Sequence, residues 1–231
     1  MEGSETTGRL PVRIPVDSDS IGGDLTVPQD AQGLVIFAHG SGSSRLSPRN
    51  RFVAQILNEA DLATLLIDLL TAEEEQVDLH TARLRFDIRL LASRLIAATE
   101  WADKRADLHE LAKGYFGAST GAAAALVAAA QLSDNIQAVV SRGGRPDLAG
   151  PVLSLVRAPT LLIVGGNDYT VIEMNEQAMD QMEIASKQLL IIPEASHLFE
   201  EEGALEAVAE AASRWFQKYL GSERQAWTEA R

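Results

Sequence analysis

The pentapeptide Gly117-Ala118-Ser119-Thr120-Gly121 lies between two segments of different hydrophobic pattern. Residues 112–116 before it are typical of a buried strand, and the alanine-rich residues 120–126 are typical of a closely packed helix. A sharp turn from strand to helix strains its middle residue, so the residues two positions away must be small. The two flanking glycines meet this requirement, and the pattern predicts a nucleophilic Ser119. A purely structural glycine-rich turn would give the same pattern, so the rest of the chain has to decide.

The composition is that of one ordinary globular domain. The chain has 231 residues, of which 46% are hydrophobic and 23% charged, and no linker-like stretch divides it. We therefore expect a single domain over residues 1–231, with flexible ends at 1–10 and 222–231. The net charge of −13 argues against a nucleic-acid partner, because phosphate binding needs a basic surface. The absence of cysteine excludes disulfides, thiolate nucleophiles and the usual structural zinc sites.

The start of the chain predicts a cytoplasmic protein. Residues 1–6 are polar and acidic, without a positively charged segment that leads into an apolar run of signal-peptide length. The longest apolar runs, such as residues 34–38 and 159–164, are far shorter than the ~20 residues of a membrane span. We expect them to be buried strands, and we expect no membrane partner.

Strand and helix patterns alternate along the chain. Nearly continuous apolar strands separated by helices indicate a mostly parallel, doubly wound α/β sheet with helices on both faces. The eight expected strands are residues 12–16, 24–27, 34–38, 63–68, 112–116, 136–140, 161–164 and 188–192. The expected helices are residues 48–60, 81–106, 120 onward, 171–179 and 204–220, and the acidic run 73–75 is expected to be a solvated loop or a helix start.

The triad partners of Ser119 follow from chain order. A serine on a strand-to-helix turn is followed by an acid and then a histidine, and this order leaves His197 as the base among four histidines. Asp168 directly follows an apolar strand and a glycine pair, so it is the predicted orienting acid. The alternative for Asp168 is a helix N-cap, a role that aspartate often fills.

The loop after residues 34–38 is expected to complete the site. Backbone N–H groups must point at the oxygen that becomes charged, and we predict those of Thr120 and Ser41. A phosphate-binding glycine loop is the alternative, although the chain lacks a Gly-Lys-Ser/Thr element. Candidate substrate contacts come from this loop and from the end of the strand at 136–140: His39, Gly40, Gly42, Arg142 and Arg145. The two arginines could bind a carboxylate or could instead form surface salt bridges.

Together these motifs resemble those of the α/β-hydrolase superfamily and, within it, the dienelactone hydrolase family. The resemblance covers nearly the whole chain and is carried by residues 39–42, 117–121, 165–168 and 197–201. Dienelactone hydrolases proper use a cysteine nucleophile, whereas this chain has Ser119. The stretch 196–205 is also similar to hydrolase domains that are fused to phosphoribosyltransferases.

The resemblance implies a serine carboxylesterase without cofactor or metal, which acts on a small-molecule ester and water. Two alternatives remain open. One is lactone or thioester hydrolysis on the same triad, and the other is a binding protein without catalysis. Only 14 residues separate Gly144 from Pro159, too few for a separate helical lid, so we expect an open cleft and short-chain acyl esters. The sequence leaves the oligomeric state open, including a homo-oligomer.

Overall fold

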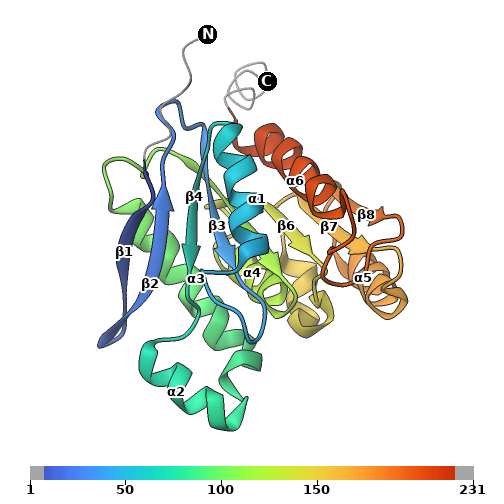
Figure 1. Cartoon of the computed structure of the whole chain (residues 1–231), viewed down its shortest axis with the longest axis horizontal. Helices are drawn as coiled ribbons and strands as arrows, with labels where there is room; N and C mark the ends of the chain where they lie inside the picture. The colour runs from blue at the N-terminus through green and yellow to red at the C-terminus, as the bar shows by residue number, and fades with distance from the viewer. Residues whose placement is uncertain (1–7, 222–231) are drawn as a thin grey trace.

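Eight strands form one sheet in the order β1-β2-β4-β3-β5-β6-β7-β8 (Figure 1). The computed structural model describes residues 8–221, so most of the expected flexible ends lie outside the described residues. Leu10, which the sequence placed in the flexible N-terminal end, already begins β1. The strands are β1 Leu10–Val16, β2 Asp19–Thr26, β3 Gly33–Ala38, β4 Leu62–Ile67, β5 Ala112–Ala118, β6 Ile136–Arg142, β7 Thr160–Gly165 and β8 Lys187–Ile192. The eight predicted strands are confirmed.

Only β2 runs against the other strands. β1 pairs with β2 in an antiparallel hairpin, β2 pairs antiparallel with β4, and every other neighbouring pair is parallel. All six residues of β3, β4 and β7 are buried, as expected for parallel strands that are covered on both faces. The carboxyl ends of β3 to β8 therefore meet at one edge of the sheet, where ligands bind in folds of this kind.

Two helices cover one face of the sheet and the remaining long helices cover the other (Figure 1). α1 (Pro48–Glu59) and α6 (Ala204–Leu220) lie in front of the sheet in this view and pack against each other. α3 (Ile88–Asp103), α4 (Thr120–Gln131) and α5 (Tyr169–Gln181) lie on the opposite face. The doubly wound architecture predicted from the sequence is confirmed.

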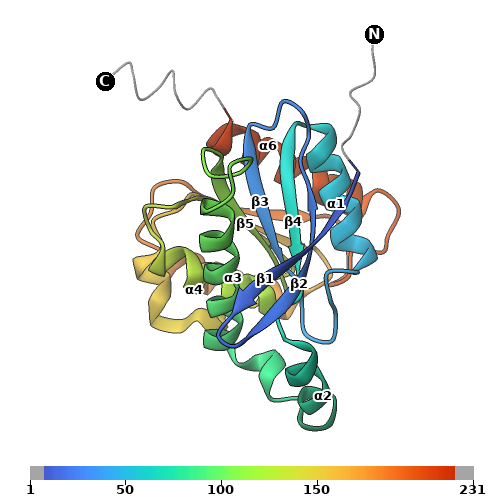
Figure 2. The ribbon, with the colours of Figure 1, turned by 90° about the vertical axis from the view of Figure 1, so that its left-hand side faces the viewer.

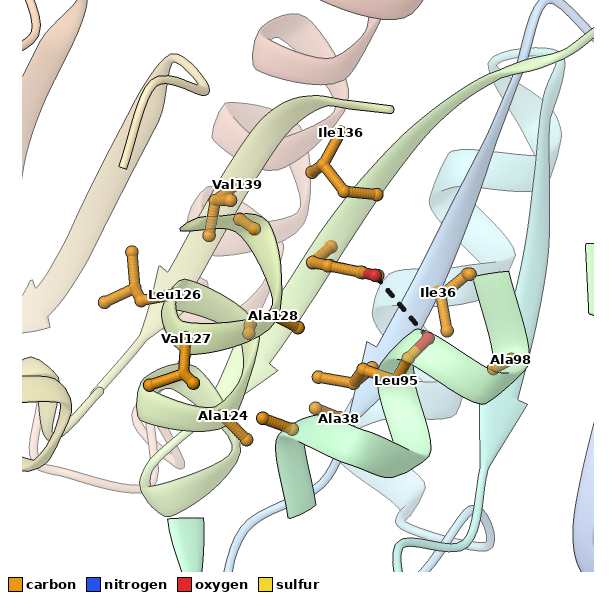
Figure 3. Close-up of a cluster of buried hydrophobic side chains, with 14 of the residues drawn as sticks. Ile36, Ala38, Leu95, Ala98, Ala124, Leu126, Val127, Ala128, Ile136 and Val139 are labelled. Carbon is orange, nitrogen blue, oxygen red and sulfur yellow. Dashed lines mark hydrogen bonds between the residues drawn. The ribbon is translucent and has the colours of Figure 1, made fainter. Parts of the chain in front are cut away.

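The alanine-rich helix α4 is the most deeply buried helix. Ten of its twelve residues are buried, because α3, the sheet and residues 146–155 enclose it. Figure 3 shows side chains of α3 and α4, among them Leu95, Ala98, Ala124 and Ala128, packed over Ile36 of β3. Small alanine side chains allow this close approach, and they fix the position of the turn that precedes α4.

The predicted helix 81–106 is wrong at its N-terminal end. Thr81 is instead the last residue of α2 (Ala72–Thr81), and a short 3-10 helix, η1 (Leu84–Phe86), separates α2 from α3. Ala82 ends α2 in a left-handed conformation with φ 51°, and the Asp87 side chain caps α3 by accepting a hydrogen bond from Leu90 N–H. The acidic run 73–75 was expected to be a solvated loop or a helix start, and the structure has the helix start, since Thr71 and Glu74 form a capping box there.

α2 extends beyond the carboxyl edge of the sheet in both views (Figures 1 and 2). Asp78 is its only buried residue, so α2 has no apolar face against the body of the protein. Residues 146–155, in contrast, form 3-10 turns (η2) packed on α4 and build no separate lid. The segment that overhangs the strand ends therefore follows β4 instead of β6.

Candidate active site

Ser119 lies at the strained turn that the sequence predicts. Its backbone has φ 51° and ψ −120°, a conformation that costs a non-glycine residue on the order of 1–3 kcal/mol. A Cβ atom at Gly117 would lie 2.4 Å from Ala122 Cα, and one at Gly121 would lie 2.5 Å from the carbonyl oxygen of Ala38. Only glycine fits at these two positions, so the turn is held between β5, α4 and the end of β3.

Hydrogen bonds also tie the Ser119 backbone to the neighbouring strand end. Ser119 N–H donates to the carbonyl of Arg142 (3.2 Å), and Arg145 N–H donates to the carbonyl of Ser119 (3.1 Å). These bonds hold the turn against the last residue of β6 and against the segment that follows it. In the described part of the chain the Ser119 hydroxyl makes no hydrogen bond, which is common for a catalytic serine without substrate.

Asp168 and His197 are brought together from two different strand ends. His197 Nδ1 donates to Asp168 Oδ2 at 2.6 Å, and the Asp168 side chain is largely shielded from solvent. Asp168 does occupy the N-cap position of α5, but its side chain makes no capping hydrogen bond there. The geometry thus favours the orienting role over the N-cap alternative, because the carboxylate is directed at the imidazole.

The loop that carries His197 is packed closely over β7. A Cβ atom at Gly165 would lie 2.4 Å from the carbonyl oxygen of Ala195. On its other side the loop contacts Gly143, where a Cβ atom would lie 3.5 Å from Cε1 of the His197 ring. His197 and Ser119 therefore flank the same short turn after β6.

His39 holds the loop that carries Ser41. Its Nδ1 donates to the carbonyl of Gly40 (2.9 Å), and its Nε2 accepts from Leu69 N–H (3.1 Å). A carbonyl cannot donate and an N–H cannot accept, so the ring is neutral and carries its proton on Nδ1. Burial lowers the pKa of His39, which favours this neutral form.

These bonds also orient the peptide between Gly40 and Ser41. Gly40 accepts a further bond from Ser43 N–H (3.2 Å), so two donors fix its carbonyl. In a trans peptide the N–H points opposite to the carbonyl, and the described residues contain no cis peptide bond. The Ser41 N–H therefore points away from the His39 ring. Gly40 itself lies against the nucleophile, since a Cβ there would be 3.1 Å from Ser119 Cβ.

An ion-pair cluster that the sequence did not indicate anchors the same loop. Arg45 donates to Asp68, after β4, from its backbone N–H (2.9 Å) and from its guanidinium. Arg45 also pairs with the buried Asp24 of β2 (3.4 Å), as does Arg51 of α1 (3.1 Å). The partners are more than 20 residues apart in the chain, so no local pattern could have indicated them.

Ser41 and Thr120 open onto one cavity of about 440 Å³, within the usual size range of small-molecule sites. The cavity also contacts His39, Gly40 and Gly42, so these predicted loop residues all reach it. Its far wall comes from the segment after β4. Its lining residues are His39, Gly40, Ser41, Gly42, Ser43, Ser44, Leu46, Ser47, Pro48, Leu69, Leu70, Glu75, Asp78, Leu79, Arg85, Leu91 and Thr120.

Arg142 is the last residue of β6, whereas the sequence placed it after the strand, and Arg145 follows β6 as expected. The two arginines have separate surroundings, and neither lines the cavity. Arg145 forms two hydrogen bonds with Asp147 (2.9 and 2.8 Å), which is the surface salt bridge that the sequence left open. Arg142 is 8% exposed and lies over the ring of Phe199. Burial, together with the nearby charge of Arg49, lowers the pKa of Arg142 to about 10.

Over residues 8–221 no group of three or more His, Asp or Glu side chains is arranged to hold a metal ion. No helix in this range is long and apolar enough to cross a membrane.

The site combines a strained serine after β5, an Asp–His pair from the loops after β7 and β8, and a glycine loop after β3. This combination defines an α/β-hydrolase. The chain is similar to a dienelactone hydrolase from Anabaena variabilis, with 61% identity and a TM-score of 0.90 over 92% of this chain and 98% of that one. The chain therefore belongs to the dienelactone hydrolase family. No family model matches it.

Two further comparisons place the chain among larger and more distant proteins. It is 58% identical over 201 residues to proteins of two Mycobacterium tuberculosis strains, each named provisionally as a phosphoribosyl transferase. The match covers 87% of this chain and 44% of the relatives, so the chain spans less than half of their length. Est1E from Butyrivibrio proteoclasticus shares the fold, with 18% identity and a TM-score of 0.75 over 90% of this chain and 98% of that one.

Proposed function

We propose that the protein is a serine hydrolase that cleaves carboxylic esters through an acyl-enzyme on Ser119. The observation that carries the proposal is the 2.6 Å hydrogen bond between His197 and Asp168, next to the turn that fixes the Ser119 backbone. A serine hydroxyl needs such an imidazole as base, and the carboxylate keeps the base in the required tautomer. Family membership supports hydrolysis, and the serine favours an ester over the chemistry of the cysteine enzymes.

The proposed reaction has two halves. Ser119 Oγ attacks the ester carbonyl while His197 Nε2 takes the hydroxyl proton, and the Ser41 and Thr120 amides stabilise the oxyanion. The tetrahedral intermediate collapses, His197 returns the proton to the leaving alcohol, and the acyl group remains on Ser119. Water then attacks the acyl-enzyme by the same steps, which releases the acid and restores the serine.

Lactone hydrolysis is the second candidate function. It is supported by the 61% identity to a protein named dienelactone hydrolase. The same serine, imidazole and amides would open a lactone ring, with the alcohol retained on the product. The two candidates therefore differ in the substrate that fits and share the catalytic steps.

The test compares Ser119→Ala with a matched control, Ser93→Ala, on the exposed surface of α3. We expect Ser119→Ala to lower kcat for 4-nitrophenyl butyrate by about 10⁵–10⁶, and Ser93→Ala to leave it unchanged. Wild-type activity in Ser119→Ala would refute the mechanism. A panel of esters, lactones and thioesters, assayed with the unmodified protein, then ranks the candidate reactions.

A further inference from the structure

Arg142 carries a buried charge without a partner from the chain. It is 8% exposed, and its Nε and Nη1 atoms are shut off from solvent. Within residues 8–221 none of its three guanidinium nitrogens donates a hydrogen bond. The third nitrogen, Nη2, is not enclosed in this way, so the guanidinium can be reached from solvent. A buried charge is costly unless it is paired, which points to an acceptor from outside the chain.

The ring of Phe199 leaves the donors of this guanidinium free. Arg142 Cζ lies over the ring, 5.9 Å from its centroid. This distance is near the outer limit of a cation–π contact, and such a contact accepts none of the in-plane N–H groups. Arg142 therefore keeps all five N–H donors in their planar arrangement, which suits the oxygens of an anion.

A second guanidinium lies beside the first. Arg49, in the first turn of α1, donates from Nη1 to Glu200 (3.3 Å), the residue that follows Phe199. Burial and, after it, the charge of Arg49 lower the pKa of Arg142, so the two cations repel each other. Arg49 Nε is also buried and has no partner among the described residues. Two elements, β6 and α1, thus bring unpaired donors to one place.

The charge at this place is positive on balance. Glu200 is the one acidic residue that pairs with either arginine over residues 8–221, and its side chain is 64% exposed. An exposed ion pair of this kind is weak and does not neutralise the buried Arg142. Glu201 and Glu202 are exposed as well, where water and salt screen their charges. The first turn of α1 contains no acidic residue, so the positive end of the helix dipole adds to the field.

A phosphate group fits this pair of arginines better than a water molecule or a carboxylate does. Water brings no charge to the buried guanidinium. A carboxylate has one negative charge and two oxygens, which a single guanidinium fork can occupy. A phosphate monoester carries about 1.5 to 2 negative charges at pH 7 and three strong acceptor oxygens, so it can bind two guanidinium groups from different directions.

We infer that Arg142 and Arg49 form a binding site for a phosphate group beside the loop that carries His197. The site is separate from the catalytic cavity, which neither arginine lines. It lies close to the nucleophile, because the backbone carbonyl of Arg142 accepts from Ser119 N–H (3.2 Å). The phosphate is either carried by the leaving alcohol, which His197 protonates, or a free ion, and the first case rests on the proposed esterase function.

Calorimetric titration of the unmodified protein with sodium phosphate, at pH 8 and constant ionic strength, tests the site without requiring catalysis. We expect one phosphate per chain, and binding of acetate that is at least tenfold weaker. Arg142→Met and Arg49→Gln should each raise the Kd for phosphate on the order of 10–100-fold, the range for hydrogen bonds to a charged group. Arg214→Gln, an exposed arginine of α6, should leave the Kd unchanged.

Thermal unfolding separates a lost site from a misfolded variant. Arg142→Met removes an unpaired buried charge, so in phosphate-free buffer it should unfold at a higher Tm than the unmodified protein, and added phosphate should no longer raise that Tm. If Arg142→Met does not fold, Arg49→Gln carries the test, because Arg49 is only partly buried. No binding of phosphate to the unmodified protein, acetate binding as tight as phosphate binding, or an unchanged Kd in the folded arginine variants would overturn the inference and leave the esterase proposal standing.

Hydrolysis of 2-acetoxyethyl phosphate and of ethyl acetate, followed by NMR, separates the two sources of the phosphate. The two esters differ only in the phosphate on the leaving alcohol. A phosphate carried by the alcohol predicts a kcat/KM that favours the phosphorylated ester at least tenfold, a preference that Arg142→Met abolishes. Equal kcat/KM values, with phosphate still bound in the titration, assign the same site to the free ion.

Discussion

Replacing His39 by asparagine or by glutamine separates the two hydrogen bonds of this ring. Asparagine places a donor near the position of Nδ1 and can keep the bond to the Gly40 carbonyl. Glutamine places an acceptor near the position of Nε2 and can keep the bond from Leu69 N–H. One bond orients the peptide that ends in Ser41 N–H, and the other satisfies a buried donor, since Leu69 is 1% exposed.

The two variants are therefore expected to fail in different ways. His39→Asn leaves Leu69 N–H unsatisfied, so the free energy of unfolding should fall by roughly 1–3 kcal/mol while kcat stays within about threefold. His39→Gln should keep most of the stability but lower kcat about tenfold or more, up to the 10²–10³ that is typical for one lost oxyanion donor. Urea unfolding and steady-state hydrolysis of 4-nitrophenyl butyrate measure the two quantities. Equal kcat values for the two variants would refute the role of His39 in orienting the Ser41 amide.

The same ring makes stability depend on pH. Burial lowers the pKa of His39 in the folded state, whereas the unfolded chain protonates near the ordinary value of 6.5. The unfolded state then binds more protons below that value, so the contribution of His39 is complete above pH 6.5 and is lost as the pH falls toward its folded pKa. The difference in unfolding free energy between the unmodified protein and His39→Asn should shrink from pH 7.5 to pH 5. A difference that is constant over this range would contradict a neutral buried His39.

Three further predictions concern the rest of the site. Asp168→Asn should fold normally and lower kcat by about 10⁴, because the imidazole loses its orienting carboxylate; a loss below tenfold in a steady-state assay would argue against the Asp168 role. Gly121→Ala would place a Cβ 2.5 Å from the carbonyls of Ala38 and His39, so the turn must move against the loop. We expect a tenfold or larger fall in kcat and a loss of about 1–3 kcal/mol in urea unfolding, and unchanged values would contradict that packing. With a cavity of about 440 Å³, acetate to butyrate esters should turn over faster than palmitate, and a reversed ranking in a chain-length series would overturn the expected acyl preference.

The sheet was predictable from sequence because its strands are nearly continuous apolar runs. The break between α2 and α3 was not, since residues 72–103 contain no glycine or proline. The break depends on Asp78, which accepts from Leu84 and Arg85, and on the cap at Asp87. Asp87 three residues before Leu90 was the one local signal that could have indicated a helix start.

For the site, chain order was enough to select residues that the fold brings together, as the contact between Asp168 and His197 shows. The roles of His39 and Arg45 depend on partners in other elements. Periodicity and motif spacing carry no information on such partners, so these roles emerged only from the three-dimensional arrangement.

Covalent trapping tests the central claim, that Ser119 forms the acyl-enzyme, most directly. The protein is incubated with a fluorophosphonate, and the modified peptide is located by mass spectrometry. The account predicts one adduct per chain on Ser119, none in Ser119→Ala, and much slower labelling in a His197→Ala variant, whose serine has lost its base. Labelling of another residue, or an unmodified Ser119 in protein that hydrolyses esters, would contradict it.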